Sequence, residues 1–245
     1  MRAAPLREGQ DPAIHLAGFT PLSLSDFPGK LAAVAFTQGC PWRCGFCHNA
    51  PLMAFPDQRS PNAQNTVFTE LMAYLHEARL VEGVVVSGGE PTWQPGLERL
   101  LRAIRGLGLA TKLDTNGMRP NVLGDLLRKG LLDYVAMDVK APPEKYAQVV
   151  RRPVDLEALK ASVALLKGSG VRAEFRTTLV PGLLEEDDLV AIGQWVNGAE
   201  RWALQTFEPK HANAKALRKR GAWDEDTTRR LAERCRSYAK EVIVR

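Results

Sequence analysis

Three of the four cysteines in this chain of 245 residues fall within eight positions, in the sequence Cys40-Pro41-Trp42-Arg43-Cys44-Gly45-Phe46-Cys47. Thiols this crowded make poor disulfide partners, and an intracellular chain would keep them reduced. The spacing C-x-x-x-C-x-x-C therefore indicates metal ligands on one short loop. Cys235 is far away in a predicted helix, and we expect it to be an inert structural thiol.

Four kinds of site compete for the cysteine loop. Structural zinc needs four ligands, and the fourth would be His48, next to Cys47, or a distant residue. The run Cys44-Gly-Phe-Cys47-His48 matches the haem attachment pattern C-x-x-C-H but leaves Cys40 unused. A thioredoxin-like pair needs only two cysteines. A [4Fe-4S] cluster uses all three thiolates and leaves one iron without a protein ligand, and Gly45 would permit the unusual φ that such a wrap requires.

Short apolar runs alternate with longer helical patterns, which predicts βα units around a parallel sheet. Six such units are fewer than the eight of a closed barrel, so we expect an α/β fold, a partial (β/α)6 TIM-like barrel that is open and mostly parallel. Residues 1–30 hold four prolines and are expected to be extended and packed on the core, with 31–245 as a single domain. Strands are expected at 31–37, 84–86, 109–113, 134–139, 172–180 and 202–207, and helices at about 66–79, 95–107, 121–129, 155–167, 186–196 and 224–240.

Polar motifs follow the ends of several predicted strands, which is the edge where parallel α/β folds bind ligands. They are Ser87-Gly88-Gly89-Glu90, Asp114-Thr115-Asn116-Gly117 and Asp138-Val139-Lys140, with Arg176 inside the fifth strand. Each also has a plain structural interpretation: a tight turn, an Asx turn, a surface ion pair and a buried ion pair.

The cysteine motif, with Phe46 before its last cysteine, resembles that of the radical S-adenosylmethionine enzymes. Three further segments are similar to the glycyl-radical-enzyme activases, most of all to the activating proteins of anaerobic ribonucleoside-triphosphate reductase. These segments are Asp26-Phe27-Pro28-Gly29, Thr37-Gln38-Gly39-Cys40 and Cys47-His48-Asn49. The resemblance implies a [4Fe-4S] cluster on Cys40, Cys44 and Cys47, with S-adenosylmethionine chelating the fourth iron.

The resemblance also implies roles for the polar motifs. Gly88, Gly89 and Glu90 would receive the amino group of S-adenosylmethionine, and Asp114 and Asn116 would lie by its methionine moiety. Lys140 and Arg176 would face the ligand, Lys140 at its carboxylate, with Asp138 near the ribose or near a monovalent cation that it would share with Asp114. Phe46 and His48 are expected to bind the cofactor, with Phe46 shielding the cluster or packing on a bound ring. Which residue replaces the family histidine after the sixth strand, Glu208 or His211, stays open.

The predicted function is therefore reductive cleavage of S-adenosylmethionine to generate a glycyl radical on a partner enzyme. Three alternatives remain: a pyruvate formate-lyase-like activase, another single-cluster radical enzyme acting on a small molecule or RNA, and a non-enzymatic iron–sulfur redox sensor. One spare cysteine leaves no room for an auxiliary cluster domain.

Composition bounds the location and the partners. No apolar run approaches the roughly 18 residues of a membrane span, and residues 1–10 lack a signal sequence, so we expect a cytoplasmic protein. The net charge is +5, and residues 209–223 contain no acid but five cations: Lys210, Lys215, Arg218, Lys219 and Arg220. This stretch is either a solvated surface or a docking face for an acidic protein such as a flavodoxin or ferredoxin electron donor. The absence of interleaved aromatic residues disfavours nucleic acid.

Overall fold

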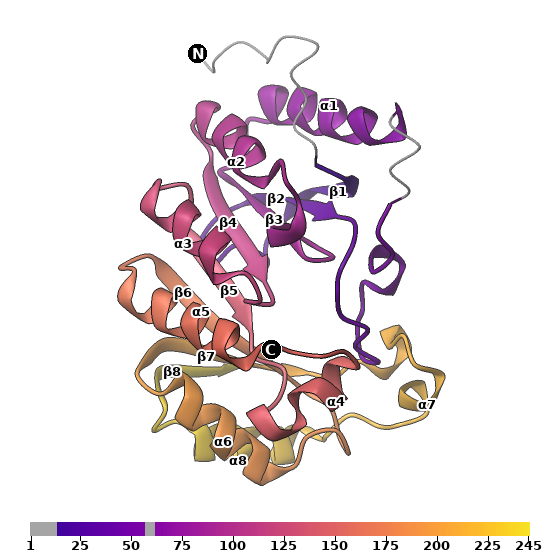
Figure 1. Cartoon of the computed structure of the whole chain (residues 1–245), viewed down its shortest axis with the longest axis vertical. Helices are drawn as coiled ribbons and strands as arrows, with labels where there is room; N and C mark the ends of the chain where they lie inside the picture. The colour runs from indigo at the N-terminus through magenta and orange to yellow at the C-terminus, as the bar shows by residue number, and fades with distance from the viewer. Residues whose placement is uncertain (1–13, 57–61) are drawn as a thin grey trace. The chain divides into compact units, whose positions relative to one another are not determined.

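The computed structural model describes residues 14–56 and 62–245, with the side chains of all of these except 62–65. Within these ranges one sheet has eight strands, and their spatial order is the same as their order along the chain (Figure 1). The strands are β1 (Leu16–Ser23), β2 (Ala32–Thr37), β3 (Gly83–Gly88), β4 (Ala110–Thr115), β5 (Tyr134–Asp138), β6 (Arg172–Leu179), β7 (Ala199–Thr206) and β8 (Ala239–Val244).

The pairing between strands is mostly parallel. β1 runs antiparallel to β2, whereas β2, β3 and β4 are parallel neighbours, as are β6, β7 and β8. Parallel neighbours need a crossover connection, and helices supply most of these crossovers. The expected open, mostly parallel α/β fold is therefore confirmed.

The helices fall between the strands, as βα units require. The α-helices are α1 (Asn62–Glu77), α2 (Leu97–Gly106), α3 (Pro120–Arg128), α4 (Tyr146–Val150), α5 (Leu156–Gly168), α6 (Glu186–Val196), α7 (Lys215–Arg218) and α8 (Glu225–Cys235). Single turns of 3-10 helix are η1 (Ala50–Leu52), η2 (Pro91–Trp93), η3 (Pro143–Lys145) and η4 (Pro209–His211). None of the helices in the described ranges combines the length and the apolar character needed to cross a lipid bilayer.

Strands β2 to β7 correspond to the six predicted strands, and β1 and β8 extend the sheet beyond them. β1 contains Pro21, which an edge strand tolerates because one of its sides needs no ladder hydrogen bonds. β8 lies where the predicted helix 224–240 would have ended: α8 stops at Cys235, a turn closes with Tyr238 N–H donating to the Cys235 carbonyl at 3.0 Å, and the chain becomes extended. Of the predicted N-terminal segment, residues 1–13 lie outside the described residues.

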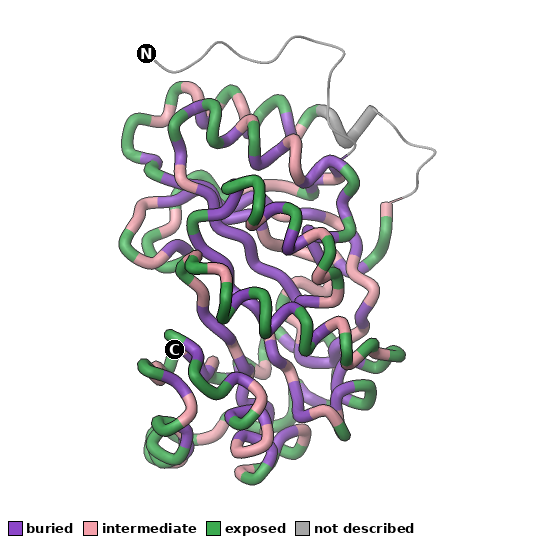
Figure 2. Tube along the Cα trace, turned by 60° about the vertical axis from the view of Figure 1, so that its left-hand side comes forward, coloured by how far each residue is buried: buried purple, intermediate pink, exposed green. Residues whose placement is uncertain are grey.

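Two compact units share the chain, and neither is continuous in sequence. The first falls in Met1–Cys40, Pro51–Thr115 and Asn121–Val135, and the second in Pro41–Ala50, Asn116–Pro120 and Ala136–Arg245. In the first unit, Phe27 and Tyr134 pack with strand residues of β2 and β3. In the second, Trp202 is fully buried, and its indole N–H donates to Thr177 Oγ1 at 3.0 Å. Buried residues follow the strands, while helices carry exposed residues on their outer sides (Figure 2).

Candidate functional site

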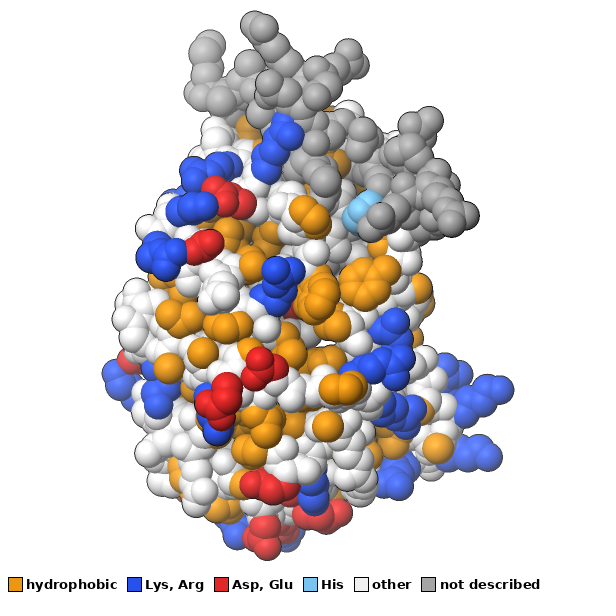
Figure 3. Space-filling view, viewed as in Figure 1, with side chains coloured by type: hydrophobic (Ala, Val, Ile, Leu, Met, Phe, Trp, Pro, Cys, Tyr) orange, Lys and Arg blue, Asp and Glu red, His pale blue; other side chains and the backbone are white. Residues whose placement is uncertain are grey.

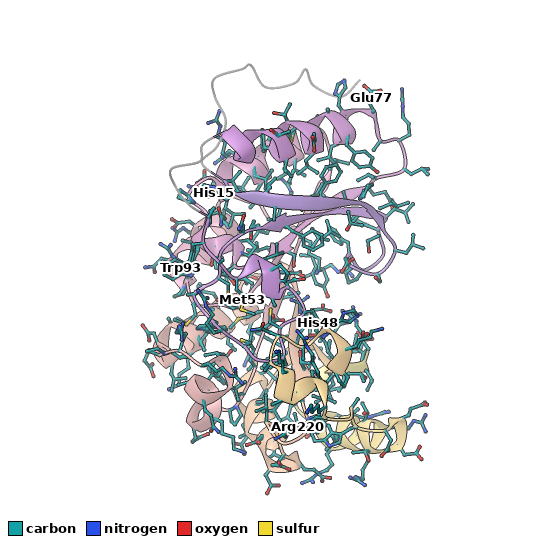
Figure 4. All side chains as sticks on the ribbon, turned by 90° about the vertical axis from the view of Figure 1, so that its right-hand side faces the viewer. His15, His48, Met53, Glu77, Trp93 and Arg220 are labelled. Carbon is teal, nitrogen blue, oxygen red and sulfur yellow. The ribbon has the colours of Figure 1, made fainter. Side chains whose placement is uncertain are left out.

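In the first unit, the segment that enters the cysteine loop is held by backbone hydrogen bonds on two sides. Gly39 N–H donates to the Leu52 carbonyl at 2.8 Å, and Cys40 N–H donates to the Met53 carbonyl at 3.1 Å (Met53 is labelled in Figure 4). From the other side, Glu90 N–H donates to the Gly39 carbonyl at 2.8 Å. The position of Cys40 is thus set by backbone contacts made after β2 ends.

The glycine pair Gly88-Gly89 allows this close approach. Gly88 has φ +110°, which side chains rarely permit, and a Cβ there would lie 2.5 Å from backbone atoms of Thr37. A Cβ on Gly89 would lie 2.3 Å from the Gly39 carbonyl oxygen. The glycines therefore let two stretches of protein backbone meet next to Cys40.

Glu90 is a buried carboxylate, 1% exposed, with a fixed orientation. Its Oε1 accepts hydrogen bonds from Thr92 N–H at 3.1 Å, from Thr92 Oγ1 at 2.6 Å and from Thr115 Oγ1 at 2.7 Å. Through Thr92 it caps η2, and through Thr115 it is tied to the end of β4. The orientation of this carboxylate is therefore maintained by η2 and by the end of β4.

Asp114 lies on β4 and pairs with a buried lysine that the sequence reading did not single out. Lys112 is 2% exposed; its ammonium group contacts Asp114 Oδ1 and lies 5.8 Å from the centre of the Tyr134 ring. Ser87 Oγ lies 3.3 Å from Asp114 Oδ2, which joins the β3 and β4 motifs. Because residues two apart in a strand share a face, a lysine two positions before the aspartate was the signal that could have revealed this pair.

In the second unit, the cysteine loop is anchored on α4 and on the start of α7. Trp42 is 2% exposed and packs on Tyr146, with ring centres 5.6 Å apart. Arg43 N–H donates to the Val150 carbonyl at 3.0 Å, and Ala214 N–H donates to the Gly45 carbonyl at 2.8 Å. Between the two cysteines, Cys47 N–H turns back to the Cys44 carbonyl at 3.3 Å.

The expectation that Gly45 serves through an unusual φ is wrong, because its φ lies outside the left-handed region. The reason for glycine here is space. A Cβ on Gly45 would lie 2.9 Å from Arg151 Nη2 and 3.2 Å from the Ala214 Cβ. A side chain at position 45 would therefore press on the Arg151 guanidinium group and crowd Ala214, just before α7.

Two cations and one carboxylate form a cluster at the end of β5 and the middle of β6. Lys140 Nζ lies 2.8 Å from Asp138 Oδ2, and Arg176 Nε lies 2.8 Å from Asp138 Oδ1. Burial opposes ionisation of Asp138, but the charges of Arg176 and Lys140 outweigh it and hold its pKa well below the usual range. Burial likewise opposes the charge on Lys140, and Asp138 outweighs it, so that its pKa is raised. The cluster carries a net charge of +1.

Lys140 also connects this cluster to the cysteine loop. Its ammonium nitrogen lies 5.7 Å from the centre of the Phe46 ring. Burial raises the pKa of Cys44 to about 11 and also raises that of Cys47, while the charge of Lys140 opposes both shifts. The second unit therefore brings Cys44, Phe46 and Cys47 into the field of Lys140.

His48 and Asn116 occupy different surroundings within the second unit. The His48 ring (labelled in Figure 4) lies 5.5 Å from the ring of His211, whose Nε2 is 3.5 Å from Glu208 Oε2. Burial lowers the pKa of His48, His211 lowers it further, and Glu208 opposes them. Of the two candidates after β7, it is His211 whose ring lies against His48.

Asn116 Oδ1 accepts a hydrogen bond from Met118 N–H at 3.0 Å, which makes Asn116 the first residue of an Asx turn.

Comparison with known proteins decides the family. The model of the radical SAM superfamily matches residues 34–192, more than half of the chain. A protein of Methanocaldococcus jannaschii, whose name describes it as a glycyl-radical enzyme activating enzyme, is 32% identical over 235 residues, covering 94% of this chain and 95% of its own. The chain belongs to the radical SAM superfamily, in the glycyl-radical-enzyme activase family.

Other members of the superfamily are similar over shorter stretches. The pyruvate formate-lyase-activating enzyme of Staphylococcus epidermidis is 29% identical over 205 residues, which is 79% of each chain. A solved domain of the pyruvate-formate lyase-activating enzyme of Bacteroides vulgatus superimposes with a TM-score of 0.55 at 16% identity, covering 66% of this chain and 98% of that domain. At that identity the likeness shows the fold alone.

Radical SAM enzymes use a [4Fe-4S] cluster and S-adenosylmethionine, and the donors of the second unit fit such groups. Iron displaces the thiol proton on binding, so the raised pKa values of Cys44 and Cys47 are no obstacle, and Lys140 offsets part of the thiolate charge. The net positive charge around Asp138 suits the carboxylate of an amino acid. Among the described residues no three His, Cys, Asp or Glu side chains gather as around one metal ion; a cubane cluster holds its thiolates on separate corners and thus wider apart.

Proposed function

We propose that this radical SAM protein generates a glycyl radical on a partner enzyme, with Cys40, Cys44 and Cys47 holding the [4Fe-4S] cluster. The observation that carries the proposal is the contact of Lys140 with both Asp138 and the ring of Phe46, because it joins the cysteine loop to a positively charged cluster that suits an amino-acid carboxylate. When bound, the cluster and S-adenosylmethionine together supply a 5′-deoxyadenosyl radical that takes a hydrogen atom from a glycine Cα.

The chain's own residues bind and orient S-adenosylmethionine in this proposal. Lys140 and Arg176 receive the carboxylate, since both are cationic, mostly buried and already aligned by Asp138. Glu90, whose orientation is fixed by Thr92 and Thr115, receives the amino group together with the backbone at Gly88 and Gly89. The remaining groups contact the rest of the ligand: Asp114 and Asn116 at the methionine moiety, Asp138 at the ribose, and Phe46 and His48, with His211, at the adenosine.

A monovalent cation beside Asp114 and Asp138 stays a prediction. Each carboxylate already contacts a cationic side chain: Lys112 for Asp114, and Lys140 and Arg176 for Asp138. A cation there would share these two carboxylates with Lys112, Lys140 and Arg176.

For the partner we propose an anaerobic ribonucleoside-triphosphate reductase, with a one-electron donor such as flavodoxin or ferredoxin. The proposal rests on the resemblance in the first 49 residues. The motif Asp26-Phe27-Pro28-Gly29 contributes to the fold itself, since Asp26 Oδ2 accepts from Ser23 Oγ at 2.5 Å and Phe27 is 2% exposed in the core. The pyruvate formate-lyase-activating relatives favour a second candidate, a pyruvate formate-lyase-like partner.

The test is anaerobic. Reconstituted protein with a strong reductant and S-adenosylmethionine should release 5′-deoxyadenosine, and mixing with the reductase should give a glycine-centred signal in electron paramagnetic resonance. Single Cys40→Ala, Cys44→Ala and Cys47→Ala variants should lose iron, sulfide and cleavage, whereas Cys235→Ala, which changes a buried thiol of α8, should keep all three.

Three results would contradict the proposal in different ways. If the protein purified without oxygen holds zinc in place of iron and sulfide, the cluster assignment on which the proposal rests is wrong. A reconstituted cluster that never cleaves S-adenosylmethionine would favour the redox sensor. Cleavage with a radical on a pyruvate formate-lyase, and none on the reductase, would assign the second partner.

A further inference from the structure

A segment rich in Lys and Arg lies directly on the cysteine loop in the second unit. It runs from residue 209 to 220, through η4 and α7, and all five of its Lys and Arg side chains are exposed. Ala212 and Leu217 are buried beneath it and fix it to the core. Figure 3 shows Lys and Arg side chains projecting where α7 lies. We call residues 209–220 the basic segment.

The positive charge of the basic segment is not matched by acids of its own. Arg218 Nε and Arg220 Nη1 donate to the carbonyls of Ala212 and Pro181, both at 2.7 Å, so these hydrogen bonds fix the guanidinium groups without neutralising them. Lys210 is 75% exposed and its nearest recorded carboxylate, Glu208, is 3.7 Å away. A surface of one sign attracts a partner of the other sign and speeds its encounter.

The contact with the cysteine loop gives this surface a specific use. Ala214 N–H donates to the carbonyl of Gly45, and Gly45 is bonded to Cys44, whose side chain is buried. A docked protein cannot touch Cys44 itself, but a protein on the basic segment would be separated from it by one hydrogen bond and the Gly45 backbone. Arg151, also exposed, adds a guanidinium group on the same glycine.

We infer that the basic segment is the docking surface for an acidic one-electron carrier protein, and that the electron enters through Ala214 and Gly45. This inference rests on the proposed function, since it assigns the donor for the same cluster. One electron leaves the reduced carrier, which is oxidised by one electron, and the cluster is reduced by one electron with no bond made or broken. A substrate protein must instead bring its glycine to the reacting carbon, which a contact with the basic segment alone does not do.

The experiment compares two variants of equal charge change. Lys215→Glu/Lys219→Glu reverses two exposed lysines of the basic segment, and Arg79→Glu/Lys160→Glu reverses two exposed cations in other segments. Reduced flavodoxin is the acidic carrier, and titanium(III) citrate is a small reductant that needs no docking surface. The readouts are the Kd of flavodoxin for the cluster-loaded protein and the rate at which the visible absorbance of the cluster bleaches.

At low ionic strength we expect the Lys215→Glu/Lys219→Glu variant to have a Kd for flavodoxin about tenfold or more higher than that of the wild type. Its rate of reduction by flavodoxin should fall by a similar factor, and both differences should shrink as salt is added. Reduction by titanium(III) citrate should be unchanged, which shows that the variant is folded and loaded. Equal behaviour of the two variants toward flavodoxin would overturn the inference. So would a variant that accepts electrons from flavodoxin normally but fails to activate the partner enzyme, because the surface would then belong to that enzyme.

The same measurements separate this inference from the proposed function. A wild-type protein that is reduced but releases no 5′-deoxyadenosine would overturn the proposed function. Carrier binding that depends on Lys215 and Lys219 would still support the docking surface in that case.

Discussion

The backbone of Gly89 lies against the backbone of Gly39, so close that a Cβ on Gly89 would sit 2.3 Å from the Gly39 carbonyl oxygen. The neighbouring Glu90 N–H donates to that same carbonyl at 2.8 Å. Since Gly39 immediately precedes Cys40, the glycine pair after β3 positions a residue of the cysteine loop as well as shaping a turn.

Gly89→Ala should therefore destabilise the protein, because the obstructing atoms are backbone and cannot swing aside. We expect the free energy of unfolding, measured in urea, to fall by about 3 kcal/mol, the upper part of the range for overpacked sites. The matched control is Gly106→Ala in α2, where a Cβ meets nothing within 4 Å. That change should be neutral or stabilising by up to about 1 kcal/mol. Equal effects of the two substitutions would contradict the steric account.

The buried pair of Lys112 and Asp114 gives a second prediction. Lys112→Met leaves a buried carboxylate without its main counter-charge, and removing one member of a buried pair costs about 3–5 kcal/mol. Lys112→Met/Asp114→Leu removes both charges and should recover most of that loss. Urea unfolding of the two single variants and the double variant completes a thermodynamic cycle. A double variant as unstable as the sum of the single variants would show that the two residues do not interact.

Asp133 provides a prediction about pH, away from the cysteine loop. Burial opposes its ionisation, but Thr111 N–H at 2.8 Å and Arg105 Nη1 at 2.7 Å outweigh it, so its pKa is lowered. A carboxyl whose folded pKa lies below its unfolded value stabilises the fold above the unfolded pKa, about 3.9 for Asp, and this stabilisation is lost as pH falls through the folded value.

Asp133→Asn should therefore be less stable than the wild type at pH 7, and the gap should narrow as the pH falls below about 4. Unfolding in urea at a series of pH values measures this gap. Asp226→Asn, at a carboxyl that is 94% exposed at the start of α8, is the comparison and should change the free energy of unfolding little. A gap for Asp133→Asn that is constant over this pH range would rule out the charge as its source.

The packing of Trp42 against Tyr146 gives a fourth prediction. Trp42→Ala removes a ring that is 2% exposed and should lower the free energy of unfolding by about 3–5 kcal/mol. Because the loop then loses its contact with α4, the iron content after reconstitution should also fall. Tyr146→Phe keeps the ring and removes only a hydroxyl group that accepts from Lys140 N–H at 3.2 Å, so it should cost about 1 kcal/mol. Similar losses from the two variants would show that ring packing is not what anchors the loop.

Sequence patterns predicted the elements whose signal is local. The apolar runs of β2 to β7 and the helical periodicity of α6, expected and found at Glu186–Val196, need only neighbouring residues to be recognised. The assignment of the three cysteines as cluster ligands also rests on local spacing, and it stays a prediction. β8 was missed because the polar run of α8 passes into Ala239–Val244 without a glycine or proline to mark the end of the helix.

The supports of the site could not be predicted, because they join residues far apart in the chain. Nothing near Gly45 indicates that Ala214 will donate to it, and nothing near Trp42 indicates Tyr146. Lys112 lies within the predicted strand 109–113, and the apolar residues around it indicate a buried strand without indicating an ion pair. Local patterns thus predict candidate site groups, whereas the residues that hold those groups in place depend on the tertiary fold.

The second unit takes the stretch Pro41–Ala50, which carries Cys44 and Cys47, from an early part of the chain. The rest of that unit begins at Ala136, apart from a short piece at 116–120. Chains are synthesised from the N-terminus at roughly 5–20 residues per second, and domains fold as they emerge. Val150 and Ala214, whose backbone groups hydrogen-bond to the loop around Cys44 and Cys47, are therefore synthesised several seconds after these cysteines. We therefore expect nascent chains to pass through an interval in which the loop lacks these contacts and both thiols are more accessible than in the folded unit.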